Sequence, residues 1–221
     1  MVLAGLFITF EGVDGCGKTT QIDLLAKSLR SAGIEALLTR EPGGTLLGDH
    51  IRKILLEPFE PAPDPMSELF LFNSARTELM RQVILPALED GYLVLCDRFI
   101  DSTLAYQGYA RGLDIDFVKA VCAAATCGRE PDRTILFEID ESTALTRSKT
   151  RLATQNSNET RFETEGIEFQ RKVSAGFSDI AKANRDRIKI VDANHTPAQI
   201  EKEVKSLLLD LLPELAQGGA V

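Results

Sequence analysis

The sequence predicts an α/β protein in which a five-stranded parallel sheet is covered by helices on both faces. Short apolar segments rich in β-branched residues alternate along the 221-residue chain with longer segments of helical periodicity. This alternation favours parallel strands, because each return to the same end of a sheet requires a helix-sized crossover. The strand-like segments are also apolar on both faces, as strands of a doubly covered sheet are.

The predicted elements of the N-terminal half are separated by clear boundary signals. The first strand is aromatic and β-branched and leads into a glycine-rich loop, after which a helical rhythm begins and stops at Gly33. A second strand ends in an Arg-Glu-Pro-Gly-Gly loop, and a proline-rich connector separates the next two helical segments. In order, these strands and helices cover residues 6–10, 18–32, 34–39, 46–56 and 67–89.

The C-terminal half continues the alternation. Gly91 precedes a third strand, Asp140 caps a helix after the fourth, and Thr196 opens the last helix with an N-cap and a capping-box glutamine. In order, the strands and helices cover residues 92–97, 114–126, 134–139, 140–151, 165–184, 188–191 and 196–211. A chain of this length fits one domain over residues 1–221, with a small lid over about 147–163.

The composition excludes several classes of protein. A formal net charge of −8 disfavours non-specific adhesion to nucleic acid or anionic membranes, but it allows a local cluster of arginines to hold a small anion. No apolar run approaches membrane-spanning length, and no basic signal segment precedes the first strand. The cysteines lack the spacing of a zinc site. We therefore expect a cytoplasmic protein with reduced thiols and without nucleic-acid or membrane partners.

The segment after the first strand predicts binding of a nucleoside triphosphate. Gly12-x-x-x-x-Gly17-Lys18-Thr19 has the spacing of a phosphate-binding loop and lies between a strand and a helix, as that motif requires. Lys18 is expected to neutralise the outer phosphates, and the Thr19 hydroxyl to coordinate Mg²⁺. A glycine turn that merely joins strand to helix would not need this lysine and threonine. The expected ATP-binding residues are Gly12, Val13, Asp14, Gly15, Cys16, Gly17, Lys18, Thr19 and Thr20.

Charged and polar residues follow the second and third strands. The loop over residues 39–45 joins a proline, two glycines and an Arg-Glu pair at a strand end, where ligands gather, although a simple turn with that ion pair is also consistent. Asp97 lies where an enzyme with a phosphate loop places its second Mg²⁺ contact, and Arg98 follows directly. The polar segment over residues 102–108 indicates a ligand wall more than a solvated loop.

Two further features are consistent with binding of a phosphorylated planar base. Phe72 and Arg76 share one helix face, so a ring and a guanidinium could hold a base, although core packing plus a surface charge gives the same pattern. Arg147, Arg151 and Arg161 bracket a polar segment that is typical of a lid closing over phosphates. An exposed basic helix end remains the alternative.

The sequence lacks signals that other classes of nucleotide-binding protein would require. A regulatory GTPase should carry an Asn-Lys-x-Asp guanine signature, and none occurs in the sequence. A binding module would not need the surplus of arginines at strand ends and around the lid. His50 and His195 lie far from every motif along the chain, and we expect both on the surface.

Taken together, the motifs resemble the successive signatures of the bacterial thymidylate kinase family over nearly the whole chain. The phosphate loop is generic, whereas the combination of the other motifs is close to diagnostic. These motifs are Arg-Glu-Pro-Gly-Gly at 40–44, Asp-Arg-Phe at 97–99, Ala-Tyr-Gln-Gly at 105–108, the base-binding helix at 71–76 and the lid sequence at 160–163. The resemblance implies a three-layer P-loop kinase fold.

The resemblance also implies transfer of the γ-phosphoryl group of ATP to dTMP, giving dTDP and ADP, with Mg²⁺ held by Thr19 and Asp97. The acceptor phosphate is already ionised at neutral pH, so positioning and cation clamping replace a catalytic base. The catalytic residues implied are Lys18, Arg98, Asp14, Arg151 and Arg161. Arg147 is implied to bind ATP. The dTMP-binding residues implied are Glu41, Pro42, Arg52, Phe72, Arg76, Arg98, Ser102, Thr103, Tyr106 and Gln107. A homodimer is implied as well.

Within that set, the resemblance implies that Arg98 bridges the donor and acceptor phosphates, Phe72 stacks on thymine, Arg76 bonds a thymine carbonyl, and Tyr106 crowds the position of a ribose 2′-hydroxyl. Two positions depart from the family pattern. The phosphate loop lacks the arginine that some relatives carry, so the lid arginines would supply that charge. Phe99 replaces a tyrosine or histidine often found there.

Overall fold

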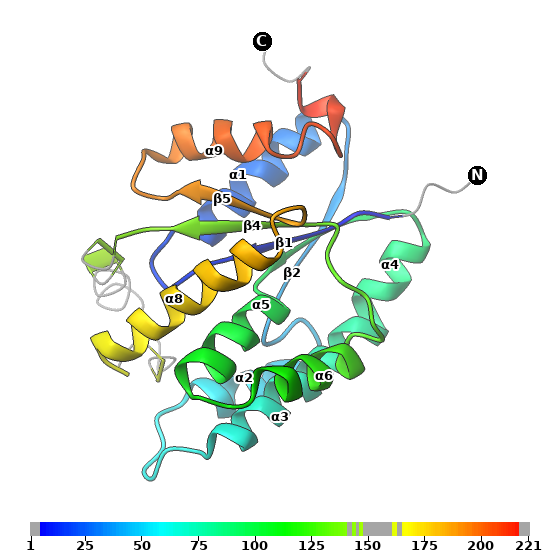
Figure 1. Cartoon of the computed structure of the whole chain (residues 1–221). Coiled ribbons are helices and arrows are strands. Elements are labelled where there is room, and N and C mark those ends of the chain that lie inside the picture. Colours follow the sequence, from blue (N-terminus) through cyan, green and yellow to red (C-terminus); the bar gives the residue numbers. More distant parts are fainter. Residues whose placement is uncertain (1–4, 141–142, 145, 148–160, 163–164, 217–221) are drawn as a thin grey trace.

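The structure is a computed structural model that describes residues 5–140, 143–144, 146–147, 161–162 and 165–216. It contains the predicted five-stranded parallel sheet, in the order β2-β3-β1-β4-β5 (Figure 1). The strands are β1 (Phe7–Glu11), β2 (Ala36–Arg40), β3 (Leu93–Asp97), β4 (Arg133–Glu138) and β5 (Ile188–Asp192). The α/β fold class and the parallel sheet are therefore confirmed.

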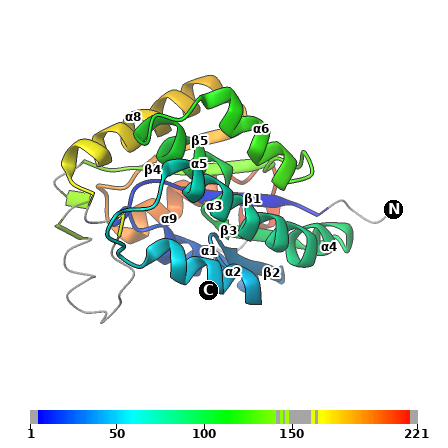
Figure 2. The same cartoon turned by 90° about the horizontal axis from the view of Figure 1, so that it is seen from below.

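Helices cover both faces of the sheet. The helices in chain order are α1 (Lys18–Ser31), α2 (Leu46–Leu56), α3 (Pro65–Leu79), η1 (Met80–Ile84), α4 (Leu85–Glu89), α5 (Ile100–Thr103), η2 (Leu104–Ala110), α6 (Ile115–Ala125), α8 (Ile167–Ala183), α9 (Pro197–Ser206) and η3 (Pro213–Ala216). α1 and α9 pack together on one face, and α8 packs with α5 and η2 on the other (Figure 1). Figure 2 shows α3 between α2 and α6, which both contact it.

Two helical segments include π-helix. The long helix expected over 67–89 contains a π-helical turn, η1, before α4. The nitrogen of Pro86 cannot donate a hydrogen bond and its ring crowds the carbonyl four residues earlier, so the helix widens there. The polar segment over 102–108, for which a ligand wall was predicted, forms the end of α5 and most of η2, and several of its residues line the cavity described below.

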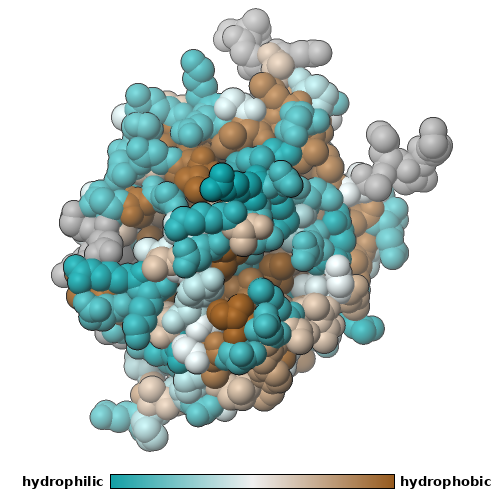
Figure 3. Space-filling model, in the orientation of Figure 1, coloured by the Kyte–Doolittle hydropathy of each residue, from teal (hydrophilic) through white to brown (hydrophobic). Residues whose placement is uncertain are grey.

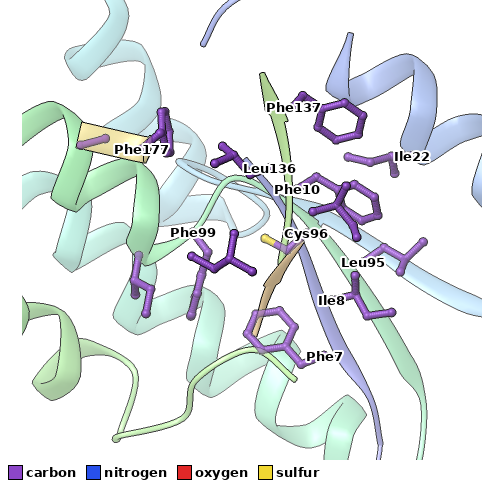
Figure 4. Close-up of a cluster of buried hydrophobic side chains, with 14 of the residues drawn as sticks. Phe7, Ile8, Phe10, Ile22, Leu95, Cys96, Phe99, Leu136, Phe137 and Phe177 are labelled. Carbon is purple, nitrogen blue, oxygen red and sulfur yellow. The ribbon is translucent and has the colours of Figure 1, made fainter. Parts of the chain in front are cut away.

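The core lies between the sheet and its two helical layers. Phe7 and Phe99 meet edge to face with ring centroids 4.9 Å apart, and Phe10 stacks with Phe137 at 6.4 Å. Figure 4 shows these rings with Cys96 beside the central strands. Burial of such rings is the main source of favourable free energy for a domain of this size.

Hydrophilic residues cover much of the face seen in Figure 3, and hydrophobic residues appear on it in several separate places. Across the residues that the structure describes, no helix is both long enough and apolar enough to cross a membrane. The predicted lid over 147–163 lies mostly outside the described residues, so it and the single-domain boundary stay predictions.

Candidate active site

A cavity of about 830 Å³ opens at the carboxyl ends of the parallel strands. Residues from the loops after β1, β2, β3 and β5 contribute to its wall, together with side chains from α3, α5 and η2. Of the predicted site residues in the described part of the chain, all but Gly12, Val13 and Arg161 line it. Predicted residues that are far apart in the sequence are therefore gathered around one space.

The phosphate loop adopts a conformation that depends on its glycines. Gly12 has φ +140° and Gly17, directly before α1, has φ +95°, in the region that favours glycine. A Cβ on Gly12 would lie 2.6 Å from the carbonyl oxygen of Phe137, so only glycine allows this loop to pass β4. The Lys18 ammonium donates to the carbonyls of Gly12 and Val13 at 3.0 Å each, which holds it beneath the loop.

One hydroxyl and one carboxylate meet where Mg²⁺ was predicted. The Thr19 hydroxyl donates to Asp97 Oδ2 at 2.8 Å, and both residues line the cavity. Oxygen ligands of this kind suit a small, hard dication, which takes its remaining ligands from water and phosphate. These two residues therefore fit the predicted metal site.

Arg98 lies between the phosphate loop and the opposite wall of the cavity. Its guanidinium donates to Asp14 Oδ1 at 2.8 Å, to the Gly12 carbonyl at 3.0 Å and to the Ser102 hydroxyl at 3.0 Å. It also lies 5.4 Å from the ring centroid of Tyr106. The backbone of Arg98 has φ +69°, a conformation that non-glycine residues rarely adopt and that is found most often at functional sites.

The opposite wall is built around a buried ion pair. Arg76 is 1% exposed and donates to Glu41 Oε2 at 2.6 Å, to the Thr103 hydroxyl at 2.8 Å and to the Asn73 amide oxygen at 2.9 Å. Burial raises the pKa of Glu41, and the neighbouring Arg76 charge opposes that shift. Glu41 thus pairs with Arg76 of α3 rather than with an arginine of its own loop. The interpretation of residues 39–45 as a simple turn held by a local Arg–Glu pair therefore does not apply.

Phe162 completes this wall and was not predicted as a site residue. Its ring lies 5.9 Å from that of Phe72 and 5.8 Å from that of Tyr106, and it lines the cavity. An aromatic residue inside an otherwise polar segment was the one signal that could have indicated it. Phe72, Tyr106 and Phe162 therefore form an aromatic cluster in this wall of the cavity.

Two of the three predicted lid arginines belong to the described residues, and their positions differ. Arg147 lines the cavity and donates to the carbonyl of Ala193 at 3.0 Å. Arg161, in contrast, is 5% exposed, pairs with Glu68 and donates to the carbonyl of Leu55 at 3.0 Å. Within the described residues, the cavity wall includes Arg147 but not Arg161. Arg151 lies outside the described residues.

The position of His195 corrects one expectation. Its side chain is partly exposed, as expected, but it lines the cavity rather than lying far from the motifs. The loop after β5 reaches the phosphate loop because α9 packs on α1, and Gln21 of α1 donates to the Pro197 carbonyl at 2.9 Å. Nothing in the sequence around His195 indicated that it would lie beside the phosphate loop.

Glu11 was also missed by the motif analysis. This residue ends β1, has a fully buried side chain, and accepts hydrogen bonds from the backbone N–H groups of Phe99 and Ser102. Burial, together with the nearby Asp101 carboxylate, raises the pKa of Glu11 to about 8. An acidic residue at the end of an apolar strand was the available signal.

Known proteins resemble the chain over nearly its full length. The family model described as thymidylate kinase matches residues 10–204. Thymidylate kinase of Trichlorobacter lovleyi is 43% identical over 208 residues, which cover 94% of this chain and 98% of that protein. Thymidylate kinase of Syntrophotalea carbinolica is 47% identical over 191 residues, or 86% of this chain and 88% of that protein. The crystal structure of thymidylate kinase from Ehrlichia chaffeensis, 35% identical, superimposes with a TM-score of 0.73 and covers 93% of this chain and 99% of that one.

Proposed function

The chain belongs to the thymidylate kinase family, and we propose that the cavity described above is where it carries out the reaction of that family. The enzyme transfers the γ-phosphoryl group of ATP to dTMP, giving dTDP and ADP in nucleotide biosynthesis. The observation that carries the assignment of the site is the place of Arg98. Its guanidinium lies between the phosphate loop and the aromatic wall of one cavity.

ATP, the phosphoryl donor, binds on the side of the cavity that the phosphate loop forms. The N–H groups of residues 12–20, the N-terminus of α1 and the Lys18 ammonium provide positive potential for its phosphates. Arg147 and His195 line the neighbouring wall and lie beside the nucleoside end of the donor. Lys18, now bonded to the Gly12 and Val13 carbonyls, turns to the phosphates when ATP binds.

Thr19 and Asp97 would hold Mg²⁺, for which their oxygen atoms are suitable ligands. When bound, the ion supplies neutralising charge to the donor phosphates. Lys18, Arg98 and the loop amides supply the remaining positive potential from the protein.

The acceptor dTMP occupies the opposite side. The ring of Phe72 provides a flat surface for thymine, and Tyr106 closes the wall near the sugar. Arg76 is held by Glu41 with its guanidinium fixed in place, which lowers the entropic cost of a hydrogen bond to a thymine carbonyl. The remaining acceptor contacts that we propose are Pro42, Arg52, Ser102, Thr103 and Gln107.

Catalysis depends on bringing two polyanions together. Arg98 bridges the two nucleotides, and Asp14, which bonds both Arg98 and Tyr106, orients the acceptor side. Since Arg161 is bound to Glu68 behind the aromatic wall, it supports that wall rather than contacting the phosphoryl group. Arg151 lies outside the described residues and remains a candidate for that contact.

We further propose that the enzyme acts as a cytoplasmic homodimer. Two aromatic side chains are unusually exposed on helices that pack against each other: Phe70 of α3 is 51% exposed and Phe117 of α6 is 41% exposed. A second copy of the chain would remove both from water. Light scattering should give twice the mass of one chain, and Phe117→Asp should shift it toward the mass of one chain.

A coupled assay of ADP release tests the function. With ATP as the donor, dTMP should be turned over much faster than dCMP or dGMP, and the rate with dUMP measures how far the site tolerates loss of the thymine methyl group. Equal turnover of all four would show that the aromatic wall does not select thymine, although the protein would still be a nucleotide kinase. Binding of ATP without any phosphorylated product would instead indicate a nucleotide-gated binding module.

A further inference from the structure

The carboxylate of Glu11 is buried directly beneath the turn that carries Arg98. Its Oε1 accepts hydrogen bonds from the backbone N–H groups of Phe99 at 2.7 Å and Ser102 at 3.2 Å. Its Oε2 accepts from the Ser102 hydroxyl at 2.5 Å. Glu11 is not among the residues that line the cavity within the described chain, so neither substrate contacts it there.

These bonds fix a backbone that would not hold its shape alone. Arg98 has φ +69°, and its N–H donates to the Phe10 carbonyl at 2.9 Å, the residue before Glu11. The next N–H along the chain, that of Phe99, donates to Glu11 itself. Backbone in this region persists only where the surroundings impose it, and here the end of β1 does so.

A second route runs from Glu11 to the guanidinium of Arg98. The Ser102 hydroxyl donates to Glu11 and accepts from Arg98 Nη1 at 3.0 Å, so one side chain joins Glu11 to the guanidinium. The turn after Arg98 and the charged end of Arg98 are thus both tied to the same buried side chain. The bond from the guanidinium to Ser102 is charge-assisted whichever protonation state Glu11 has.

Asp14 cannot replace this support during the reaction. The Arg98–Asp14 pair is solvent-accessible, with side chains 18% and 23% exposed, and both residues line the cavity. Incoming phosphates therefore compete with Asp14 for the guanidinium. Glu11 is out of their reach and keeps its contacts when the cavity fills.

We propose that Glu11 is a positioning residue for phosphoryl transfer, which sets the place of the Arg98 guanidinium through Ser102 and through the backbone of residues 98–102. This proposal rests on the bridging role of Arg98 proposed above. Since misplacement of a catalytic group by about 1 Å can lower a rate by two orders of magnitude, loss of this support should reduce kcat more than substrate binding.

Glu11→Gln keeps the size of the side chain but replaces one acceptor oxygen with an amide NH₂ group. This group cannot accept the hydrogen bonds that Phe99 and Ser102 donate to Glu11. We expect kcat to fall about 10- to 100-fold, with the KM for dTMP changed less than about threefold. Asp132→Asn is the matched control, because Asp132 also accepts a backbone N–H bond from β1, that of Phe7 at 2.7 Å, at the opposite end of the strand. The control should retain kcat.

A double-mutant cycle distinguishes positioning from a general loss of structure. In an Arg98→Ala background, Glu11→Gln should have almost no further effect on kcat, because the residue that it positions is gone. An equal loss in both backgrounds would overturn the proposal, as would normal kcat in Glu11→Gln. Near-normal activity of Arg98→Ala alone would instead remove the bridging role on which the proposal rests.

Ser102→Ala keeps the proposal testable if Glu11→Gln does not fold. It removes the hydroxyl that links Glu11 to Arg98, which we also place beside the acceptor, so kcat and the KM for dTMP have to be measured together. We expect a kcat about tenfold lower, with the KM for dTMP changed less than about threefold and a thermal midpoint close to that of the unmodified enzyme. Unchanged kcat in this variant would contradict the link through Ser102. Thermal midpoints of all variants should be measured beside the kinetics.

Discussion

The Thr19 hydroxyl donates a hydrogen bond of 2.8 Å to a carboxylate oxygen of Asp97, although 78 positions separate the two residues in sequence. The bond joins the first turn of α1 to the end of β3 and leaves two side-chain oxygen atoms side by side at the cavity wall. No local pattern in the sequence connects these residues. The parallel pairing of β1 with β3 does, because it brings the ends of both strands to one edge.

Asp97→Asn should raise the Mg²⁺ concentration needed for half-maximal activity about tenfold or more, because an amide oxygen is a weaker ligand for Mg²⁺ than a carboxylate. Initial rates measured over a range of Mg²⁺ concentrations, at fixed ATP and dTMP, test this. Thr19→Ser keeps the hydroxyl and is the matched control. A normal Mg²⁺ response in Asp97→Asn would exclude Asp97 as a ligand.

Arg98→Ala should lower kcat by about a thousandfold, as expected for a cationic clamp in phosphoryl transfer. The thermal midpoint should change little, because the guanidinium is partly exposed to the cavity. Arg30→Ala, which removes an exposed arginine from the last turn of α1, should leave kcat unchanged. Activity within tenfold of normal in Arg98→Ala would take Arg98 out of the mechanism.

Glu41→Gln should lower the free energy of unfolding by about 3 kcal/mol or more, because it leaves the Arg76 charge buried without its partner. Denaturant unfolding without nucleotides measures this. Asp116→Asn breaks an ion pair to Lys119 whose side chains are 92% and 59% exposed, and should cost less than about 0.5 kcal/mol. Similar losses in the two variants would show that burial of the Arg76–Glu41 pair is unimportant.

Burial raises the pKa of Glu11 to about 8 from its ordinary value of 4.5. Between these values the folded chain keeps a proton that the unfolded chain loses, so this group lowers stability as the pH rises from about 4.5 to 8. Glu11→Gln cannot titrate, and its free energy of unfolding relative to the unmodified enzyme should therefore increase over that range. Denaturant unfolding at pH 5, 6.5 and 8 tests this, and a constant difference would contradict it.

The same variant separates stability from catalysis. From pH 5 to pH 8 the stability of Glu11→Gln should rise relative to that of the unmodified enzyme, while its kcat stays low. A residue that served only to hold the fold together would lower both quantities.

The sequence was sufficient for the fold and for most of the cavity wall. Alternating strands and helices predict a parallel sheet, and residues directly after the strands, such as Asp97, then have to meet at one edge. Phe72 and Arg76 share a helix face, and their place in the wall follows from the motif series. The sheet and its edge therefore follow from local periodicity and one topological rule, whereas the assignment of residues such as Phe72 and Arg76 to the wall came from the family resemblance.

What could not be predicted depends on contacts between distant segments. His195 reaches the cavity because α9 packs on α1, and Arg161 is drawn away from it by the buried Glu68. Glu11 directly follows the predicted first strand, and nothing near it in the sequence shows that the turn after β3 donates to it. Such long-range pairs become visible only when the chain is folded.

The position of β1 in the middle of the sheet has a consequence for synthesis. The first strand made lies between β3 and β4, so one of its two partners is complete only after Asp97 and the other only after Glu138 has been made. The phosphate loop passes close to Phe137 of β4, so its surroundings are also incomplete until then. The apolar first strand therefore lacks part of its cover through much of synthesis, a condition that favours aggregation of a growing chain.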